Sequence, residues 1–154
     1  MILEQISDDT PFHVVRDLAV MVKEFKLTQD TQDHLVDDLM VYIDWVISEL
    51  SKGVEFYVIR GKGYIVAEPY HDILKKPEFA RCIMLTSVYV RPLFRNTRVY
   101  GILIHGLLRK YSGLRVVGSA MIGSTHSKVL DRRFKKIANV YVANINKEDL
   151  CQRL

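Results

Sequence analysis

The sequence of 154 residues predicts one α/β domain built on a mixed, mainly antiparallel sheet. Apolar strand patterns alternate with helical periodicities in the order β-α-α-β-β-β-α-β-α-β. The strand–turn–helix–strand run from Cys82 to Ile122 predicts a central pair of parallel strands joined by a right-handed crossover. The domain should span residues 1–154, because the chain has the usual length of one domain and contains no linker, repeat or low-complexity segment.

Two helices are expected before the main sheet, after a short strand over Met1–Ile6. Thr10-Pro11 suits the start of the first helix, whose apolar residues recur at helical spacing as far as Phe25. The second helix should run from about Asp30 to Gly53. Its predicted inner face consists of Leu35, Val36, Leu39, Ile43, Val46 and Leu50.

The middle of the chain predicts three strands. Val54–Arg60 and Gly63–Tyr70, joined across Gly61-Lys62, have the pattern of a hairpin. The polar segment His71–Arg81 is expected to be a loop. Cys82–Val90 is apolar on both alternating faces, which is typical of a strand buried in the middle of a sheet.

The remaining elements alternate between helix and strand. A helix is expected from Val99 to near Gly113, followed by a strand over Leu114–Ile122. A fourth helix is expected over about Ser124–Ile137, and the last of six strands over Asn139–Ile145. In open α/β sheets ligands bind at the carboxyl ends of parallel strands, so the edge from Val90 to Arg98 is the expected binding region.

Composition favours a cytoplasmic protein with an anionic ligand. No apolar run approaches the ~20 residues that span a bilayer, so no membrane association is expected. The two cysteines show no metal or disulfide spacing, which favours a reducing compartment and no metal site. The net charge is +4, and residues 91–136 are strongly basic with Asp131 as their one acid. An anionic ligand would bind in this basic half.

Basic residues in the predicted fourth helix raise a second interpretation, nucleic-acid binding. They are Lys128, Arg132, Arg133, Lys135 and Lys136. Any amphipathic helix at the surface also carries charged residues on the face that contacts solvent. No interleaving of basic and aromatic residues supports binding to nucleic acid, so a solvated face is the simpler interpretation.

The run Val88-Tyr89-Val90-Arg91-Pro92-Leu93-Phe94-Arg95 has the form hydrophobic-x-Val-x-Pro-x-aromatic-Arg. It leads into a turn and a helix with paired aliphatics, namely Leu103, Ile104, Leu107 and Leu108. This segment and the element order resemble the GNAT superfamily of acyl-CoA-dependent N-acetyltransferases. The resemblance implies a GNAT-like fold and transfer of an acetyl group from acetyl-CoA to an amine acceptor, either a small molecule or a protein.

In that family, a turn with the pattern Arg-x-x-Gly-x-Gly/Ala binds the pyrophosphate of coenzyme A. Here Arg98 and Tyr100 occupy the two small positions. Backbone N–H groups at a helix start can hold a phosphate whatever the residue type, except proline, and Arg98 could add a charge-assisted contact. The resemblance implies cofactor contacts from Val88, Val90, Arg95, Asn96, Thr97, Arg98, Val99 and Tyr100. Lys128 or Arg132 could meet the anionic end of the cofactor near its adenine.

Catalytic candidates are a base and an acid. Glu68 is our preferred general base, with Glu55 second; the alternative for Glu68 is an ordinary solvated carboxylate at a strand end. The family's acid tyrosine aligns with Phe134, which has no hydroxyl, so Tyr141 is our candidate acid, with Tyr89 as a substitute. Either tyrosine could instead pack its ring in the core and leave its hydroxyl in contact with solvent.

Two further points stay open at this level. Of the histidines, His105 is expected on the solvated side of its helix, whereas His126 is expected beside the edge of the parallel strands. Because the turn and the acid position both depart from the family pattern, a catalytically silent GNAT-like binding or structural protein is the alternative function. A homodimer is among the assemblies that the sequence leaves open.

Overall fold

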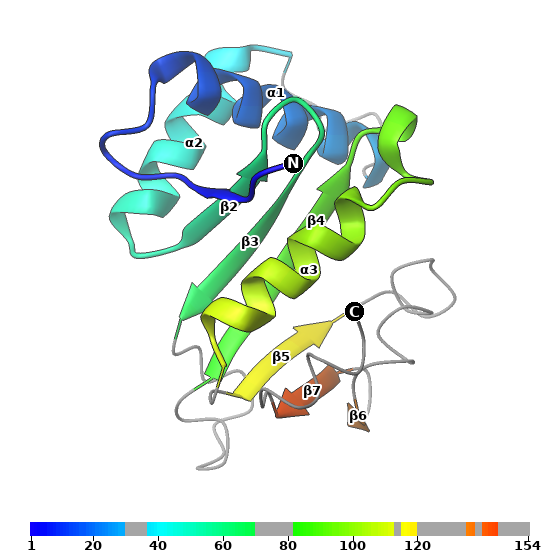
Figure 1. The fold of residues 1–154 in the computed structure, drawn as a ribbon. Helices are drawn as coiled ribbons and strands as arrows, with labels where there is room; N and C mark the ends of the chain where they lie inside the picture. Colours follow the sequence, from blue (N-terminus) through cyan, green and yellow to red (C-terminus); the bar gives the residue numbers. More distant parts are fainter. Residues whose placement is uncertain (30–36, 70–81, 113–114, 120–134, 138–139, 145–154) are drawn as a thin grey trace. The chain divides into compact units, whose positions relative to one another are not determined.

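The computed structural model describes residues 1–29, 37–69, 82–112, 115–119, 135–137 and 140–144 (Figure 1). The chain divides into two compact units, the N-terminal unit with Met1–Val66 and Val88–Leu103, and the C-terminal unit with Ala67–Ser87 and Ile104–Leu154. The mixed α/β class expected from the sequence is confirmed. The single domain over residues 1–154 stays a prediction.

The N-terminal unit contains two helices, two complete strands and parts of three further elements. In chain order these elements are β1 (Glu4–Gln5), α1 (Phe12–Gln29), α2 (Leu39–Ser51), β2 (Glu55–Ile59), β3 (Gly63–Pro69), β4 (Cys82–Val90), the 3₁₀ turn η3 (Pro92–Phe94) and α3 (Val99–Lys110). Of β3, β4 and α3, the residues in this unit are Gly63–Val66, Val88–Val90 and Val99–Leu103. Hydrogen bonds join the strands in the order β1, β2, β3, β4. β1 is antiparallel to β2, with Glu4 opposite Val58.

One face of these strands forms a hydrophobic core with α1 and α2, which lie side by side in Figure 1. Phe56, Tyr64 and Tyr89 contribute aromatic rings from β2, β3 and β4, and Leu18 from α1 is fully buried in the same cluster. Phe25 packs edge-on against Tyr64, with ring centroids 6.4 Å apart. Burial of such large side chains is the main source of stability for this unit.

The β2–β3 hairpin is joined by a tight turn, as expected from Gly61-Lys62. Gly61 adopts a φ of 70°, a conformation that glycine tolerates and side chains disfavour. Gly63 is needed for a different reason, close approach. A Cβ there would lie 2.5 Å from the Tyr89 carbonyl oxygen and 3.2 Å from Leu103 Cδ1. β3 can therefore run this close to β4 and the first turns of α3 only with glycine at position 63.

The C-terminal unit continues from β4 through β5 (Arg115–Ser119) and β7 (Val140–Asn144) to β6 (Lys135–Ile137). β4 and β5 are parallel, with Cys82 opposite Arg115 and Leu85 opposite Gly118. The other two pairings, β5 with β7 and β6 with β7, are antiparallel. The predicted strand–helix–strand unit with parallel strands is thus confirmed.

The start of α2 differs from the expectation. The helix begins at Leu39, not near Asp30, because the Asp38 carboxylate accepts a hydrogen bond from Met40 N at 2.9 Å and caps the helix. Of its predicted inner face, Ile43 and Val46 are buried. Leu35 and Val36 lie outside the described residues.

The end of the predicted fourth helix is also wrong. Lys135–Ile137 form the strand β6, whose register places Lys136 opposite Tyr141 and Ile137 opposite Val140. This adds a seventh strand to the six expected, because antiparallel pairing with β7 satisfies the backbone groups of these residues. Residues 124–134 of the predicted helix lie outside the described residues. Among the described helices, none has both the length and the apolarity that crossing a membrane requires.

Candidate functional site

The candidate site is the segment that follows β4. The strand ends at Val90, and a single 3₁₀ turn over Pro92–Phe94 redirects the chain, closed by a hydrogen bond from Phe94 N to Arg91 O at 2.9 Å. Proline suits the first position of such a turn because its φ is already fixed and it needs no partner for an N–H. Four residues separate this turn from α3, which begins at Val99. The strand–turn–helix order expected from the sequence is therefore present.

The residues between the 3₁₀ turn and α3 are exposed. They are Arg95, Asn96, Thr97 and Arg98. Arg95 Nε donates to the Val90 carbonyl oxygen at 3.2 Å, so this guanidinium also braces the turn against the end of β4. Two arginines thus stand at the surface beside the start of a helix, an arrangement suited to an anion.

The start of α3 is ordered by Thr97. Its hydroxyl donates to Phe94 O at 2.6 Å and accepts from Val99 N at 3.3 Å. The first regular helical bond runs from Ile102 N to Arg98 O at 2.9 Å. A ligand phosphate that takes the Val99 N–H would therefore displace a long hydrogen bond to Thr97.

The other predicted cofactor residues differ in exposure. Val99 points into the core, with its side chain fully buried, so only its backbone could serve a ligand. Tyr100 is half-buried. On β4, Val90 is buried and Val88 is half-buried. Contacts from Val88 and Val90 would likewise involve the backbone, as the resemblance implies.

The two preferred catalytic residues, Glu68 and Tyr141, both belong to the C-terminal unit. Glu68 is half-buried on β3. The backbone of Tyr141 lies on β7 between Gly118 of β5 and Lys136 of β6, and its side chain lies outside the described part of the chain. Their roles as base and acid stay predictions.

The two second-choice residues have structural partners. The Tyr89 hydroxyl donates to Glu24 Oε2 at 3.0 Å, and burial together with this hydrogen bond raises the pKa of Tyr89 to about 12. Glu55 accepts a hydrogen bond of 2.6 Å from the Tyr57 hydroxyl. Burial, reinforced by Glu55, raises the pKa of Tyr57 above its ordinary value. In this structure Tyr89 and Glu55 therefore bind neighbours within the sheet and α1.

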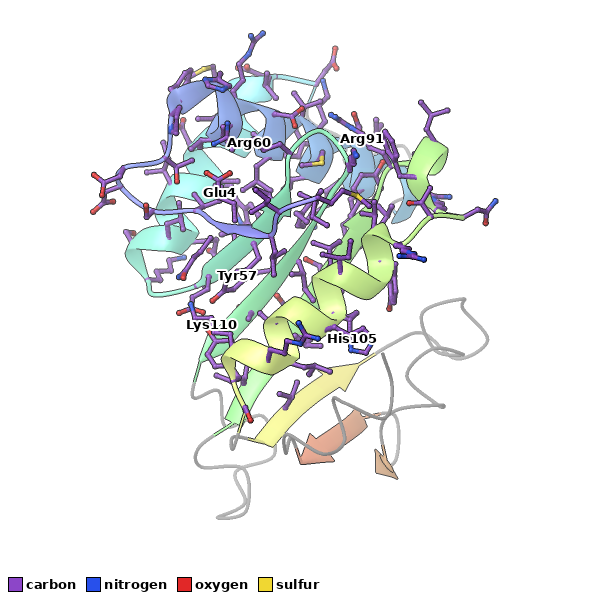
Figure 2. All side chains as sticks on the ribbon, in the orientation of Figure 1. Glu4, Tyr57, Arg60, Arg91, His105 and Lys110 are labelled. Carbon is purple, nitrogen blue, oxygen red and sulfur yellow. The ribbon has the colours of Figure 1, made fainter. Side chains whose placement is uncertain are left out.

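His105 is buried, with 8% of its surface exposed, which contradicts its expected position on a solvated face. The reason is that the buried surface of α3 is wider than one apolar face. Ile104 and Leu108 are buried as well as Leu107. Figure 2 labels His105 on α3. The other residues singled out from the sequence lie outside the described ranges: His126, Lys128, Arg132, Arg133 and Phe134.

Sequence reasoning missed a cluster of charges at the end of β4. Arg91 Nη2 contacts Asp17 Oδ1 at 3.0 Å, and Arg91 Nε contacts Glu24 Oε2 at 3.0 Å. The two acids lie seven residues apart on α1, which places them on the same helix face. That spacing is a usable signal for the acidic pair, but nothing local in the sequence connects it to Arg91.

Comparison with known proteins gives fold-level matches. No protein-family model matches the sequence, and no curated protein matches it. Among solved structures, the chain is similar to AAC(6')-Iy in complex with the bisubstrate analog CoA-S-monomethyl-acetylneamine (TM-score 0.61, 16% identity, 85% of this chain and 86% of that chain covered). It is also similar to RimL, a ribosomal L7/L12 alpha-N-protein acetyltransferase in complex with coenzyme A (TM-score 0.63, 15% identity, 94% of this chain and 94% of that chain covered).

A third similar structure is an acetyltransferase of the GNAT family from Desulfovibrio desulfuricans, with a TM-score of 0.57, 14% identity, and coverage of 93% of this chain and 99% of that chain. Identities this low show the fold and leave the chemistry to the residues themselves. All three matches extend over most of both chains, and the parallel β4–α3–β5 unit is in place. The chain therefore has the fold of the GNAT acetyltransferases.

Proposed function

We propose that the protein is an acyl-CoA-dependent N-acyltransferase that moves an acetyl group from acetyl-CoA to an amine acceptor. The observation that carries this proposal is the segment after β4, where a braced turn presents Arg95 and Arg98 at the start of α3. The fold supports it, since RimL was solved with coenzyme A and AAC(6')-Iy with a bisubstrate analog that contains CoA. The acceptor class, a small molecule or a protein amine, stays open.

The turn suits a pyrophosphate even without glycines. Arg98 is exposed, and its carbonyl, not its side chain, accepts the first helical hydrogen bond. In our proposal its side chain swings toward the bound anion. The N-terminal end of α3 adds the positive end of the helix dipole. Charge-assisted contacts from Arg98 would thus replace the close approach that glycines allow.

The acyl donor supplies a thioester, which an amine attacks directly when both are aligned. In our proposal Glu68 accepts a proton from the acceptor amine, directly or through water, and Tyr141 donates a proton to the departing sulfur. The C–N bond forms as the C–S bond breaks: the amine nitrogen loses one proton to Glu68, and the departing thiolate gains one from Tyr141. Alignment supplies much of the rate, so loss of either residue should slow the reaction without abolishing it.

The test combines titration calorimetry with acetyl-CoA and an assay of free thiol released in the presence of amines. Binding with turnover supports the proposal. Arg98→Ala should weaken acetyl-CoA binding about tenfold, which is the effect of one charge-assisted hydrogen bond. Its melting temperature should stay unchanged because the side chain is exposed. Unchanged affinity in this variant would refute the role of Arg98.

A catalytically silent binding protein is the second candidate. It is favoured by one observation: the Tyr89 hydroxyl donates to Glu24, and burial together with this hydrogen bond raises the pKa of Tyr89 to about 12, which makes it a weaker proton donor. Acetyl-CoA binding without thiol release, across a panel of small amines and peptides, would establish this alternative.

A further inference from the structure

Arg91 connects three segments of the N-terminal unit that are far apart in the sequence. Its guanidinium donates to Asp17 and Glu24 of α1 and, through Nη1, to the Gly61 carbonyl oxygen at 3.0 Å. Its backbone N–H donates to Lys62 O at 2.9 Å. The end of β4 is therefore joined both to α1 and to the β2–β3 turn. Figure 2 labels Arg91 beside that turn.

The acids are themselves held in place. Asp17 Oδ2 accepts a hydrogen bond from Gly61 N at 3.1 Å, and Glu24 Oε2 accepts one from the Tyr89 hydroxyl. Arg91 contacts Glu24 through both Nε and Nη2, which is the two-point geometry in which arginine differs from lysine. The side chains of this ion pair are 22% exposed at Arg91 and 33% at Glu24, so Arg91 is better shielded from water than Arg60, which is 55% exposed in its pair with Glu4.

Arg91 is also the residue at which the strand becomes the turn. Pro92 follows it directly, and the carbonyl oxygen of Arg91 closes the 3₁₀ turn by accepting a hydrogen bond from Phe94 N. Whatever fixes Arg91 therefore fixes the direction in which the chain leaves β4. The residues positioned in this way are those of the exposed turn, Arg95–Arg98, and the start of α3 at Val99 and Tyr100.

We propose that Arg91 is a positioning residue for the pyrophosphate turn, and that its bonds to Asp17 and Glu24 hold the turn in the conformation that receives the ligand. This inference rests on the proposed function. A turn ordered beforehand loses less conformational entropy when it binds, which strengthens binding without any contact to the ligand. Here that ordering is supplied from α1.

The variants follow from the geometry. Arg91→Met removes the charge and keeps most of the side-chain length, whereas Arg91→Lys keeps the charge and loses the two-point contact. Glu24→Gln removes the charge of the partner carboxylate and keeps its shape. It replaces Arg91→Met in the test if Arg91→Met does not fold. Arg60→Met is the matched control, because Arg60 makes a two-point contact of the same kind with Glu4 between β2 and β1 (Figure 2).

The first readout needs no ligand. Hydrogen exchange of the amides from Leu93 to Tyr100 should become roughly tenfold faster in Arg91→Met and in Glu24→Gln, an effect equal to the loss of about one charge-assisted hydrogen bond. Arg60→Met should leave these amides unchanged. Equal exchange in Arg91→Met and the wild type would overturn the proposal.

The second readout is calorimetric affinity for acetyl-CoA, measured on the same full-length variants. Arg91→Met should bind about tenfold more weakly, Arg91→Lys should recover part of that loss, and Arg60→Met should bind as the wild type does. Because Glu24 acts on the turn through Arg91 in this proposal, the double variant Arg91→Met/Glu24→Gln should bind no more weakly than Arg91→Met alone. Additive losses would overturn a role exerted through Glu24.

The two readouts separate the two claims. If the wild type does not bind acetyl-CoA, the proposed function fails, and hydrogen exchange still decides whether Arg91 holds the turn. If the wild type binds and the affinity of Arg91→Met is unchanged, the proposed function stands and the positioning role is overturned.

Discussion

The end of β4 and the turn that follows it are adjacent in the chain but are built in opposite ways. At the strand end, Tyr89 and Arg91 direct their polar groups inward, to Glu24 and Asp17 on α1. In the turn, Arg95 and Arg98 are exposed. A binding segment needs both properties, since a fixed framework positions groups that are themselves accessible to a ligand. The difference in exposure separates the residues that hold the turn in place, Tyr89 and Arg91, from the residues that would bind a ligand, Arg95 and Arg98.

The largest effect on stability should come from Gly63→Ala, which disturbs the close approach of β3 to β4. Its Cβ would lie 2.5 Å from a backbone oxygen that cannot rotate away, so the strands must separate. We expect a loss of about 2–3 kcal/mol in the free energy of unfolding. Urea denaturation followed by circular dichroism measures it.

Gly61→Ala is the control for this variant. A Cβ there meets nothing within 4 Å, and the cost comes from its φ of 70° alone. That cost should be about 1 kcal/mol. If the two glycine variants were equally stable, close packing beside Tyr89 would not be what position 63 requires.

An intermediate effect is expected at alkaline pH from Tyr89. Its pKa, raised to about 12 by burial and by Glu24, lies above the ordinary value of 10.0. The neutral hydroxyl therefore stabilises the folded state fully below pH 10, and this contribution is lost as the pH rises from 10 to 12. The loss should be about 1 kcal/mol, since solvent screens part of the interaction.

Tyr89→Phe tests this assignment, because it removes the titrating group and keeps the ring. The alkaline fall in unfolding free energy, measured with urea between pH 9 and pH 12, should be smaller in the variant than in the wild type. The same fall in both proteins would place the alkaline transition elsewhere.

The smallest effect should come from the ion pair between Glu4 and Arg60, which resembles the Arg91 cluster in geometry and differs in exposure. The hydrogen bond from Arg60 lowers the pKa of Glu4, so its contribution is present above the ordinary pKa and is lost as the pH falls through the lowered one. Glu4→Gln should cost under about 1 kcal/mol at pH 7, and this cost should shrink as the pH falls through the lowered pKa of Glu4. A cost that did not change with pH would mean that packing, not charge, is responsible.

The parts of the fold with local patterns were predictable. The hairpin, β4 and α3 follow from alternation, a glycine turn and helical spacing, and the parallel pairing of β4 with β5 follows from the crossover rule. Two boundaries were not predicted. Apolar spacing at Leu35 and Val36 extended the second helix beyond its cap at Asp38, and Lys135–Ile137 are a strand only because β7 lies beside them.

The position of the candidate turn could be predicted from the sequence, but the ion pairs that hold it in place could not. The motif from Val88 to Arg95 marks the turn, and the exposure of Arg95 and Arg98 agrees with a binding role. The ion pairs of Arg91 join residues 67 and 74 positions apart, and no local rule connects such distant charges. Only the packing of α1 against the sheet brings them together.

The central claim is that the turn from Arg95 to Tyr100 receives the pyrophosphate of an acyl-CoA, and thermal denaturation with and without acetyl-CoA tests it most directly. At 100 times its dissociation constant the ligand should stabilise the folded protein by about 2.7 kcal/mol, which raises the melting temperature by several degrees. That shift should be reduced in Arg98→Ala. An unchanged melting temperature of the wild type at millimolar acetyl-CoA would contradict the account.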